Sequence, residues 1–338
     1  MSAERFVIIG NGPAANEAAK VLLDQSPGSR ITIFGKEPAR YYKPHLLPDL
    51  IAGRIGSDKI YAITDTFSTD RAIQVRLGQK VAHVDFNKRH IILEHKEIVS
   101  FDGLIIATGG RPRIPETLEA FQDILLTLKT TLDAQLWIEK LARVESALII
   151  GGDLTSLSLT RALISLGKRV SFIINEDSFW PLPFNEKLHT EIHSRLCDKG
   201  VNVVSSRKIK RLAQLSEDLI EVETECEKFQ VGVVGAFFGL VPDISFLARS
   251  GLDLDRGILV DENLRTRFAN VYAAGDCAQV YNPLIRDYWV SIGYDNARTL
   301  GRIAALNLLG GMITAQTAPE SIFSLNGVRV NTSWWMEF

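Results

Sequence analysis

The feature that most constrains the fold is a glycine loop near the N-terminus. Residues 10–15 (GNGPAA) follow an apolar run at residues 6–9 and precede a helical pattern. In this GxGxxA spacing, Gly10 permits a tight turn, Gly12 lets the backbone approach a diphosphate, and Ala15 lets the helix pack closely on the strand. The N-terminus of the helix then faces the phosphates with its partial positive charge. The loop therefore predicts a strand–turn–helix unit that binds a dinucleotide.

The strand–helix–strand pattern occurs twice in the chain. The first unit continues into an apolar strand at residues 31–34. The second consists of a strand at residues 147–150, a helix at residues 154–166 and a strand at residues 170–174. With 338 residues the chain is long enough for two domains, each with its own core. We therefore expect an α/β fold with two Rossmann-like domains.

The regions outside these two units also contain recognisable elements. Alternating apolar segments at residues 75–86 and 91–98 indicate antiparallel strands, and residues 103–107 indicate a buried strand. Turn-forming residues at 109–115 indicate a crossover between domains. Near the end of the chain, residues 271–309 predict a further strand and a long helix.

Composition and charge exclude several other classes of protein. The 38 basic and 40 acidic side chains give a formal charge of −2, which argues against nucleic acid as a partner. Cys197, Cys226 and Cys277 are far apart and form no zinc or iron-sulfur motif, so no metal site is expected. The apolar stretch at residues 231–241 is too short to span a bilayer. Because no secretory signal precedes the first strand, we expect a cytoplasmic location.

Two later motifs indicate which dinucleotide the first loop binds. Residues 104–110 (LIIATGG) and 266–277 (TRFANVYAAGDC) resemble two FAD-binding motifs of the pyridine nucleotide-disulfide oxidoreductase superfamily. The three motifs occur in the family's order, and the resemblance extends through Gly311. Residues 41–48 and 52–53 are most similar to the ferredoxin, rubredoxin and nitrite reductase flavoprotein branch. The resemblance implies FAD as the cofactor and a FAD domain interrupted by a NAD-type domain.

The resemblance also implies a division of the chain. Residues 1–112 and 241–311 are assigned to the discontinuous FAD-binding domain, and residues 113–240 to an NAD(P)H-type Rossmann domain. Residues 312–338 form a short C-terminal tail. Residues 38–56 contain no cysteine, although disulfide-reducing members carry one or two there, so disulfide chemistry is not expected.

The resemblance extends to individual residues of the FAD site. The residue matching Asp276 binds the ribityl chain, and Glu37 stands where a carboxylate can accept hydrogen bonds from ribose hydroxyls. The family usually has arginine in place of Lys43, which keeps the positive charge but loses the bidentate fork. The residues expected to contact FAD are Gly10, Gly12, Pro13, Ala14, Ala15, Glu37, Lys43, Val81, Ala107, Thr108, Gly109, Gly275 and Asp276.

The second glycine loop departs from the fingerprint. Residues 151–156 (GGDLTS) carry Asp153 and Ser156 in place of the second and third glycines. Two like unit charges about 4 Å apart repel by about 4 kcal/mol at an effective dielectric of about 20, so an aspartate here opposes a diphosphate. Two alternatives stay open: a vestigial site, or a shifted backbone with Asp153 pointing away that still binds NADH weakly. The residues of this degenerate NAD site are Gly151, Gly152 and Asp153.

The motifs support one leading functional hypothesis and two alternatives. The leading hypothesis is an FAD-dependent oxidoreductase that moves electrons between NADH and a one-electron partner such as an iron-sulfur protein, with no catalytic side chain because the flavin carries the chemistry. The first alternative is the FAD subunit of a larger metal or iron-sulfur redox complex. The second is a non-catalytic, flavin-stabilised subunit with a vestigial NAD site.

The C-terminal tail bears on the oligomeric state. Residues 331–338 (NTSWWMEF) are rich in the aromatic and Met side chains that protein interfaces favour. Docking on another subunit, in a homodimer or a hetero-oligomer, and folding back on the chain's own core are both compatible with this composition.

Overall fold

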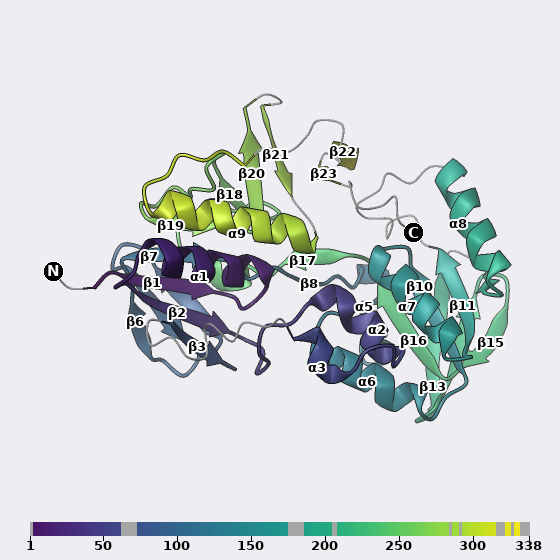
Figure 1. The fold of residues 1–338 in the computed structure, drawn as a ribbon. Helices are drawn as coiled ribbons and strands as arrows, with labels where there is room; N and C mark the ends of the chain where they lie inside the picture. The colour runs from purple at the N-terminus through teal and green to yellow at the C-terminus, as the bar shows by residue number, and fades with distance from the viewer. Residues whose placement is uncertain are drawn as a thin grey trace. The chain divides into compact units, whose positions relative to one another are not determined.

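The computed structural model describes residues 3–61, 73–174, 186–204, 208–283, 286–290, 293–315, 322–325 and 328–331. The chain divides into two compact units (Figure 1). Unit 1 comprises Met1–Lys43, Tyr61–Arg111 and Val241–Phe338, and unit 2 comprises Pro44–Ile60 and Pro112–Leu240. The segment Pro44–Ile60 thus packs in unit 2 and not with the remainder of residues 1–112.

Unit 1 is built on a five-stranded parallel sheet with the order β19-β7-β1-β2-β3. Its strands are β1 (Arg5–Ile9), β2 (Arg30–Gly35), β3 (Ile73–Leu77), β7 (Gly103–Ile106) and β19 (Val271–Ala273). All of β7 and all but the first residue of β1 are buried, as continuous apolar runs in a parallel sheet predict. The strand order reverses between β1 and β7, and sheets of this kind bind ligands at the carboxyl ends of such strands.

Two helices of unit 1 lie side by side against this sheet, α1 (Pro13–Gln25) and α9 (Tyr294–Leu308) (Figure 1). Proline is favoured at the first position of α1 because its missing N–H has no helical partner there. The first half of α1 buries four small side chains almost completely, namely Ala14, Ala15, Ala18 and Ala19. The approach of α9 is so close that a Cβ on Gly301 would lie 2.1 Å from the carbonyl oxygen of Ala14.

The remaining strands of unit 1 form smaller sheets. Strands β4 (Val81–Asp85), β5 (His90–Leu93) and β6 (Ile98–Ser100) are antiparallel. The prediction of antiparallel pairing for the whole of residues 75–86 is wrong, because the chain turns at Gly78 (φ +66°) and β3, before the turn, pairs parallel to β2. A second five-stranded sheet contains β18 (Ile258–Val260), β20 (Ala278–Asn282), β21 (Asp287–Val290), β22 (Ile322–Leu325) and β23 (Val328–Asn331).

The hairpin of β22 and β23 lies within residues 312–338, and β23 pairs parallel to β21. The cluster of Trp334, Trp335, Met336 and Phe338 lies outside the described residues. Its docking on a partner or on the chain itself stays a prediction.

Unit 2 repeats the parallel arrangement, with the order β12-β11-β10-β16-β9. Its strands are β9 (Leu125–Leu126), β10 (Ser146–Gly151), β11 (Arg169–Ile174), β12 (Asn202–Val203) and β16 (Val233–Phe237). Its helices are η1 (Pro44–Leu46), α2 (Leu47–Ile51), α3 (Ser57–Ile60), α5 (Glu116–Glu119), α6 (Thr131–Leu141), α7 (Leu154–Ser165) and α8 (Glu186–Asp198). Here the strand order reverses between β10 and β16.

The other strands of unit 2 form a three-stranded antiparallel sheet of β13 (Ile209–Ser216), β14 (Leu219–Thr224) and β15 (Lys228–Val231). The short strands β8 (Gly110–Pro112) and β17 (Leu240–Pro242) pair with each other where the chain passes between the units. The 3-10 helix η3 (Ser245–Leu247) follows β17. The predicted α/β class with two Rossmann-like sheets is confirmed, and both strand–helix–strand units lie at the positions that the apolar patterns indicate.

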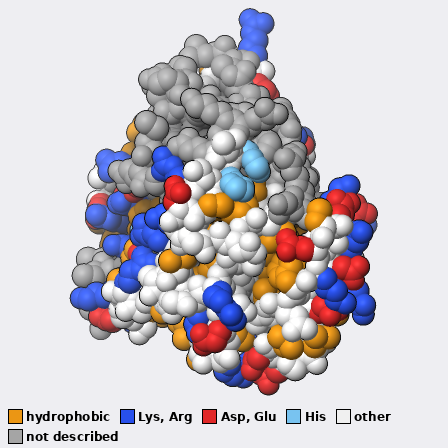
Figure 2. All heavy atoms as spheres, turned by 90° about the vertical axis from the view of Figure 1, so that its right-hand side faces the viewer, with side chains coloured by type: hydrophobic (Ala, Val, Ile, Leu, Met, Phe, Trp, Pro, Cys, Tyr) orange, Lys and Arg blue, Asp and Glu red, His pale blue; other side chains and the backbone are white. Residues whose placement is uncertain are grey.

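On the described part of the face in Figure 2, both acidic and basic side chains occur, with basic side chains prominent along the left edge. Acidic and basic side chains are intermixed along the right edge, and apolar side chains occur between them. Among the described residues, none of the helices combines the length and the apolar character needed to cross a bilayer.

Candidate functional site

The first glycine loop joins β1 to α1 at the carboxyl end of the unit 1 sheet. Gly10 has φ +116°, and a Cβ there would lie 2.1 Å from the carbonyl oxygen of Ala107. The Gly10 amide donates to Phe34 O at 2.8 Å, and the Ala107 amide donates to Ile9 O at 2.7 Å. Only glycine therefore fits where the loop passes between β2 and β7.

The next glycine of the loop has a different environment. Gly12 is the N-cap of α1 with φ −87° and ψ −170°, and its helix receives no side-chain cap. The first backbone hydrogen bond of α1 runs from Asn16 N to Gly12 O at 3.1 Å. The backbone N–H groups that come before Asn16 therefore have no acceptor within the helix. A Cβ on Gly12 would meet no atom within 4 Å. The N-terminus of α1 thus faces open space, which suits the binding of an anion.

Asn16 holds the shape of this loop and was missed by the sequence analysis. The side chain is 5% exposed, and its Nδ2 donates to Asn11 O at 3.1 Å and to Gly12 O at 3.0 Å. By binding the loop carbonyls, Asn16 turns them toward the helix and away from the space in front of the helix N-terminus. The available signal was a single amide among the small apolar residues at the start of α1.

The strand ends of β7 and β19 complete the same edge of unit 1. Gly109 has φ +63°, and a Cβ there would meet no atom within 4 Å, whereas a Cβ on Gly275 would lie 3.2 Å from the Cβ of Ala14. Gly275 therefore brings the half-buried Asp276 close to the first turn of α1. The structure thus places the two C-terminal FAD motifs beside the first loop.

Cys277 follows Asp276 and is fully buried. Burial raises the pKa of the thiol. Hydrogen bonds that involve Thr108 and the backbone of Gly109 act in the opposite direction but are the smaller effect. Its Sγ donates to Ile106 O and Ala274 O, each at 3.4 Å. Cys277 thus packs as a small buried side chain.

The other predicted FAD residues lie elsewhere in unit 1. Glu37 follows β2, and the Tyr42 hydroxyl donates to its Oε2 at 2.9 Å. The Gly78 amide donates to Glu37 O at 3.2 Å, which joins the Glu37 segment to the turn before β4. Val81 is buried at the start of β4, and the half-buried Lys43 ends the first segment of unit 1. The roles of Glu37, Val81 and Lys43 in binding FAD stay predictions.

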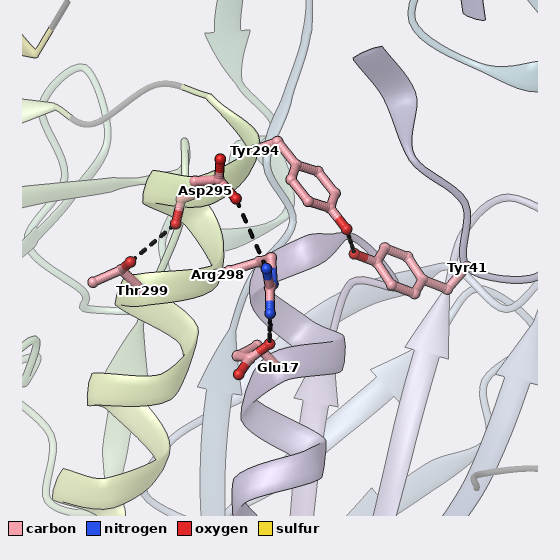
Figure 3. Close-up of polar contacts among 6 residues, drawn as sticks. All are labelled: Glu17, Tyr41, Tyr294, Asp295, Arg298 and Thr299. Carbon is pink, nitrogen blue, oxygen red and sulfur yellow. Dashed lines mark hydrogen bonds and ion pairs between the residues drawn. The ribbon is translucent and has the colours of Figure 1, made fainter. Parts of the chain in front are cut away.

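A polar network fastens the first turns of α9 to α1 and to the segment after β2 (Figure 3). The Arg298 guanidinium donates to Glu17 Oε2 from Nη2 at 2.9 Å and from Nε at 3.1 Å. The hydroxyls of Tyr41 and Tyr294 are 2.8 Å apart and form a hydrogen bond. The pKa of Tyr41 is raised, mainly because the side chain is buried and secondly because of this hydrogen bond. Sequence patterns could not indicate the pair, because its members are 253 positions apart.

The second loop joins β10 to α7 in unit 2 and keeps the tight turn. A Cβ on Gly151 would lie 2.3 Å from Phe237 O, much as one on Gly10 would meet Ala107 O. Gly152 is buried, and Asp153 follows it as the N-cap of α7. The fold of the loop therefore survives the loss of its second and third glycines.

Asp153 uses its carboxylate within unit 2. Its Oδ1 accepts from Ser156 N at 2.8 Å, and its Oδ2 accepts from Gly239 N at 3.1 Å. Ser156 is fully buried, and its hydroxyl donates to Asp153 O at 2.5 Å. Burial raises the pKa of Asp153 to about 6, against hydrogen bonds from Ser156, Gly239 and Thr155 that lower it. The carboxylate is thus held at the N-terminus of α7.

Two parallel sheets, each with a glycine loop at the point where the strand order reverses, define a protein with two dinucleotide-binding folds. Residues 4–297 match the family described as pyridine nucleotide-disulphide oxidoreductase, and the chain belongs to that family.

Individual proteins are similar over most of the chain. A 3-phenylpropionate/cinnamic acid dioxygenase ferredoxin–NAD(+) reductase component from Photorhabdus laumondii is 27% identical over 311 residues, which cover 92% of this chain and 79% of that protein. A nitric oxide reductase FlRd-NAD(+) reductase from Citrobacter koseri is 25% identical over 335 residues, covering 97% and 88%. The crystal structure of the covalent putidaredoxin reductase–putidaredoxin complex has a TM-score of 0.84 at 21% identity, covering 96% and 79%, and shows the same fold.

The residues of unit 1 fit a dinucleotide such as FAD. The space in front of Gly12 is open, the N-terminus of α1 has no side-chain cap, and Asp276 follows a strand end that touches the first turn of α1. A diphosphate satisfies donors of this kind, and a carboxylate at the strand end can accept hydrogen bonds from a polyol.

Proposed function

We propose that this chain is an FAD-dependent oxidoreductase that moves electrons between NADH and a one-electron partner such as an iron-sulfur protein. The observation that carries the proposal is the open, uncapped N-terminus of α1 at the reversal point of the unit 1 sheet. The names of the relatives, a ferredoxin–NAD(+) reductase component and a FlRd-NAD(+) reductase, support the pairing of a nicotinamide cofactor with a redox protein as partner.

Each unit has its own part in this proposal. We assign FAD binding to residues 1–112 and 241–311, apart from residues 44–60, which pack in unit 2, and nicotinamide binding to residues 113–240. Docking on a partner is assigned to residues 312–338, of which residues 322–325 and 328–331 pair in a sheet of unit 1. When bound, FAD accepts a hydride and releases single electrons. The chain's own residues bind and orient: the Gly12 loop holds the diphosphate, and Asn16 keeps the loop carbonyls turned away from it.

Two carboxylates would hold the sugar and polyol parts of FAD. Asp276 accepts hydrogen bonds from the ribityl hydroxyls and Glu37 from the adenosine ribose, with Glu37 oriented by the Tyr42 hydroxyl. Lys43, Val81, Ala107, Thr108, Gly109 and Gly275 belong to the same proposed site. A cytoplasmic location is part of the proposal, because all three cysteines are free thiols and disulfides are rare in that compartment.

Anaerobic titration of the purified flavoprotein with NADH, and separately with NADPH, tests the function. The expected result is loss of the oxidised-flavin absorbance with NADH and transfer of electrons from the reduced protein to a ferredoxin. A flavin that dithionite reduces but NADH does not, at any concentration, would contradict the NADH role. It would favour the FAD subunit of a larger complex or the non-catalytic subunit.

A further inference from the structure

The two glycine loops of this chain provide an internal comparison. Both follow the central strand of a parallel sheet, and both open a helix at the reversal point. Gly10 and Gly151 hold the same tight turn against the carbonyl at the end of the neighbouring strand. The residue that caps the helix is Gly12 in unit 1 and Asp153 in unit 2. At the capping position the two loops therefore differ by one carboxylate.

The strand ends that face the loops are also equivalent. In unit 1, β7 is followed by Gly109 with φ +63°, and in unit 2, β16 is followed by Gly239 with φ +75°. Each of these glycines precedes one of the paired strands β8 and β17. In unit 2 the Gly239 amide donates to Asp153 Oδ2. The same carboxylate also accepts from Ser156 N in the first turn of α7.

Asp153 thus places an anion of the protein where the first loop leaves space for a ligand's anion. A carboxylate that accepts from the first turn of a helix satisfies the donors, and balances the partial positive charge, that otherwise attract a phosphate. A diphosphate entering this loop would meet donors that are already engaged and a negative charge close by. Both effects weaken its binding.

We propose that Asp153 is a specificity-determining residue that acts as a built-in substitute for the diphosphate and lowers the affinity of unit 2 for NADH. This inference rests on the proposed function, because it concerns the nicotinamide role assigned to unit 2 above. It predicts a loop whose fold is intact and whose affinity can be restored by one substitution.

Titration calorimetry of the oxidised FAD-loaded protein with ADP-ribose and with NAD⁺ tests the proposal. ADP-ribose carries the diphosphate but no nicotinamide, and neither ligand reduces the flavin. We expect D153G to bind both ligands about tenfold more tightly than the unaltered protein. Two unit charges about 4 Å apart repel each other at an effective dielectric of about 20. A third of this repulsion is enough to weaken binding about tenfold.

D153N separates charge from folding. Asparagine is as good an N-cap as aspartate and keeps its size, so its amide oxygen can still cap α7 while the charge and the acceptor for Gly239 N are removed. We expect D153N to tighten ADP-ribose binding by severalfold, and this variant decides the test if D153G is unstable. The control is D133N, because Asp133 accepts from Lys129 N and Thr130 N at the start of α6 in the same unit. This control should leave the affinity unchanged.

The outcomes distinguish this inference from the function itself. Equal affinities for D153G, D153N and the unaltered protein, or an equal gain in D133N, would overturn the role of Asp153 whatever NADH does to the flavin. Undetectable binding in all variants would overturn it as well. Tighter ADP-ribose binding in D153G, with a flavin that NADH still fails to reduce, would support the role of Asp153 and contradict the NADH reductase function.

Discussion

Gly10 and Gly12 belong to one fingerprint, yet the structure requires glycine at these positions for different reasons. At Gly10 the protein itself excludes a side chain, because a Cβ would overlap Ala107 O and the φ of +116° is unfavourable for other residues. At Gly12 the protein leaves the space empty, and φ −87° is accessible to alanine. The second glycine is therefore needed for a ligand and not for the fold.

Alanine substitutions separate the two reasons. We expect G10A to lower the free energy of unfolding of the apoprotein by about 3 kcal/mol or more, from overpacking and backbone strain. We expect G12A to leave apoprotein stability within about 0.5 kcal/mol and to lower the flavin-to-protein ratio, because its methyl group enters the ligand space. Urea unfolding and flavin absorbance measure the two quantities. A G12A protein that retains its full flavin content would show that the diphosphate does not lie at this loop.

Sequence analysis locates the loop residues but not the directions of their side chains. The fingerprint placed Gly10, Gly12 and Gly151 correctly at the two turns, since their spacing is set by local backbone geometry. It could not decide where the Asp153 carboxylate lies, because one of its donors, Gly239 N, is 86 positions away. The same limit applies to Tyr41 and Tyr294, which meet only in the folded protein.

At the scale of elements, periodicity fixed the type of most strands and helices but not their pairing. Strand β1 and helix α1 were predictable, because a buried parallel strand is a continuous apolar run and the loop supplies a helix start. Strand β3 was not, because a half-exposed edge strand has the same alternation whether its neighbour runs parallel or antiparallel. Only the turn at Gly78 separates β3 from β4.

The crossing of α1 and α9 reverses the usual effect of glycine in a helix. Replacing a glycine by alanine in an exposed helix stabilises by about 1 kcal/mol. At Gly301 the new Cβ would lie 2.1 Å from Ala14 O, so α9 must move away from α1. We expect G301A to lower the free energy of unfolding by about 1–3 kcal/mol.

The same variant should also release flavin, because Ala14 belongs to the first turn of α1. Urea unfolding of the apoprotein and the rate of flavin loss measure the two effects. The matched control is T299A on the same helix, where the exposed Thr299 hydroxyl only donates to Asp295 O. Stabilisation by G301A would contradict the close crossing of α1 and α9.

At the scale of the whole molecule, the two units contain carboxyl groups whose pKa values are displaced in opposite directions. In unit 1, hydrogen bonds from Arg76 and then His95 lower the pKa of Glu97 to about 2, and a hydrogen bond from Arg5 lowers that of Asp102 to about 2. In unit 2, burial raises the pKa of Asp153 to about 6. Because ordinary values are near 4, acid should affect the two units in different pH ranges.

The signs follow from proton linkage. Glu97 and Asp102 stabilise the folded state above their unfolded pKa near 4, and this contribution is lost as pH falls from about 4 toward 2. Asp153 holds its proton more tightly when folded than when unfolded. Its ionisation therefore opposes folding above about pH 6, and this opposition disappears as pH falls from about 6 to 4.

Urea midpoints measured from pH 7 to pH 2.5 test this division, with each variant compared with the unaltered protein. We expect the difference between D153N and the unaltered protein to change between pH 6 and 4 and to be constant below. For D102N and E97Q the difference should be constant above about pH 5 and change only below it, modestly, because both ion pairs are largely exposed and screened by salt. If D153N follows the unaltered protein through pH 6 to 4, the surroundings at the start of α7 do not raise the pKa of Asp153. The carboxylate would then be solvated and screened, although still ionised at neutral pH, and its repulsion of a bound diphosphate would be weaker than proposed above.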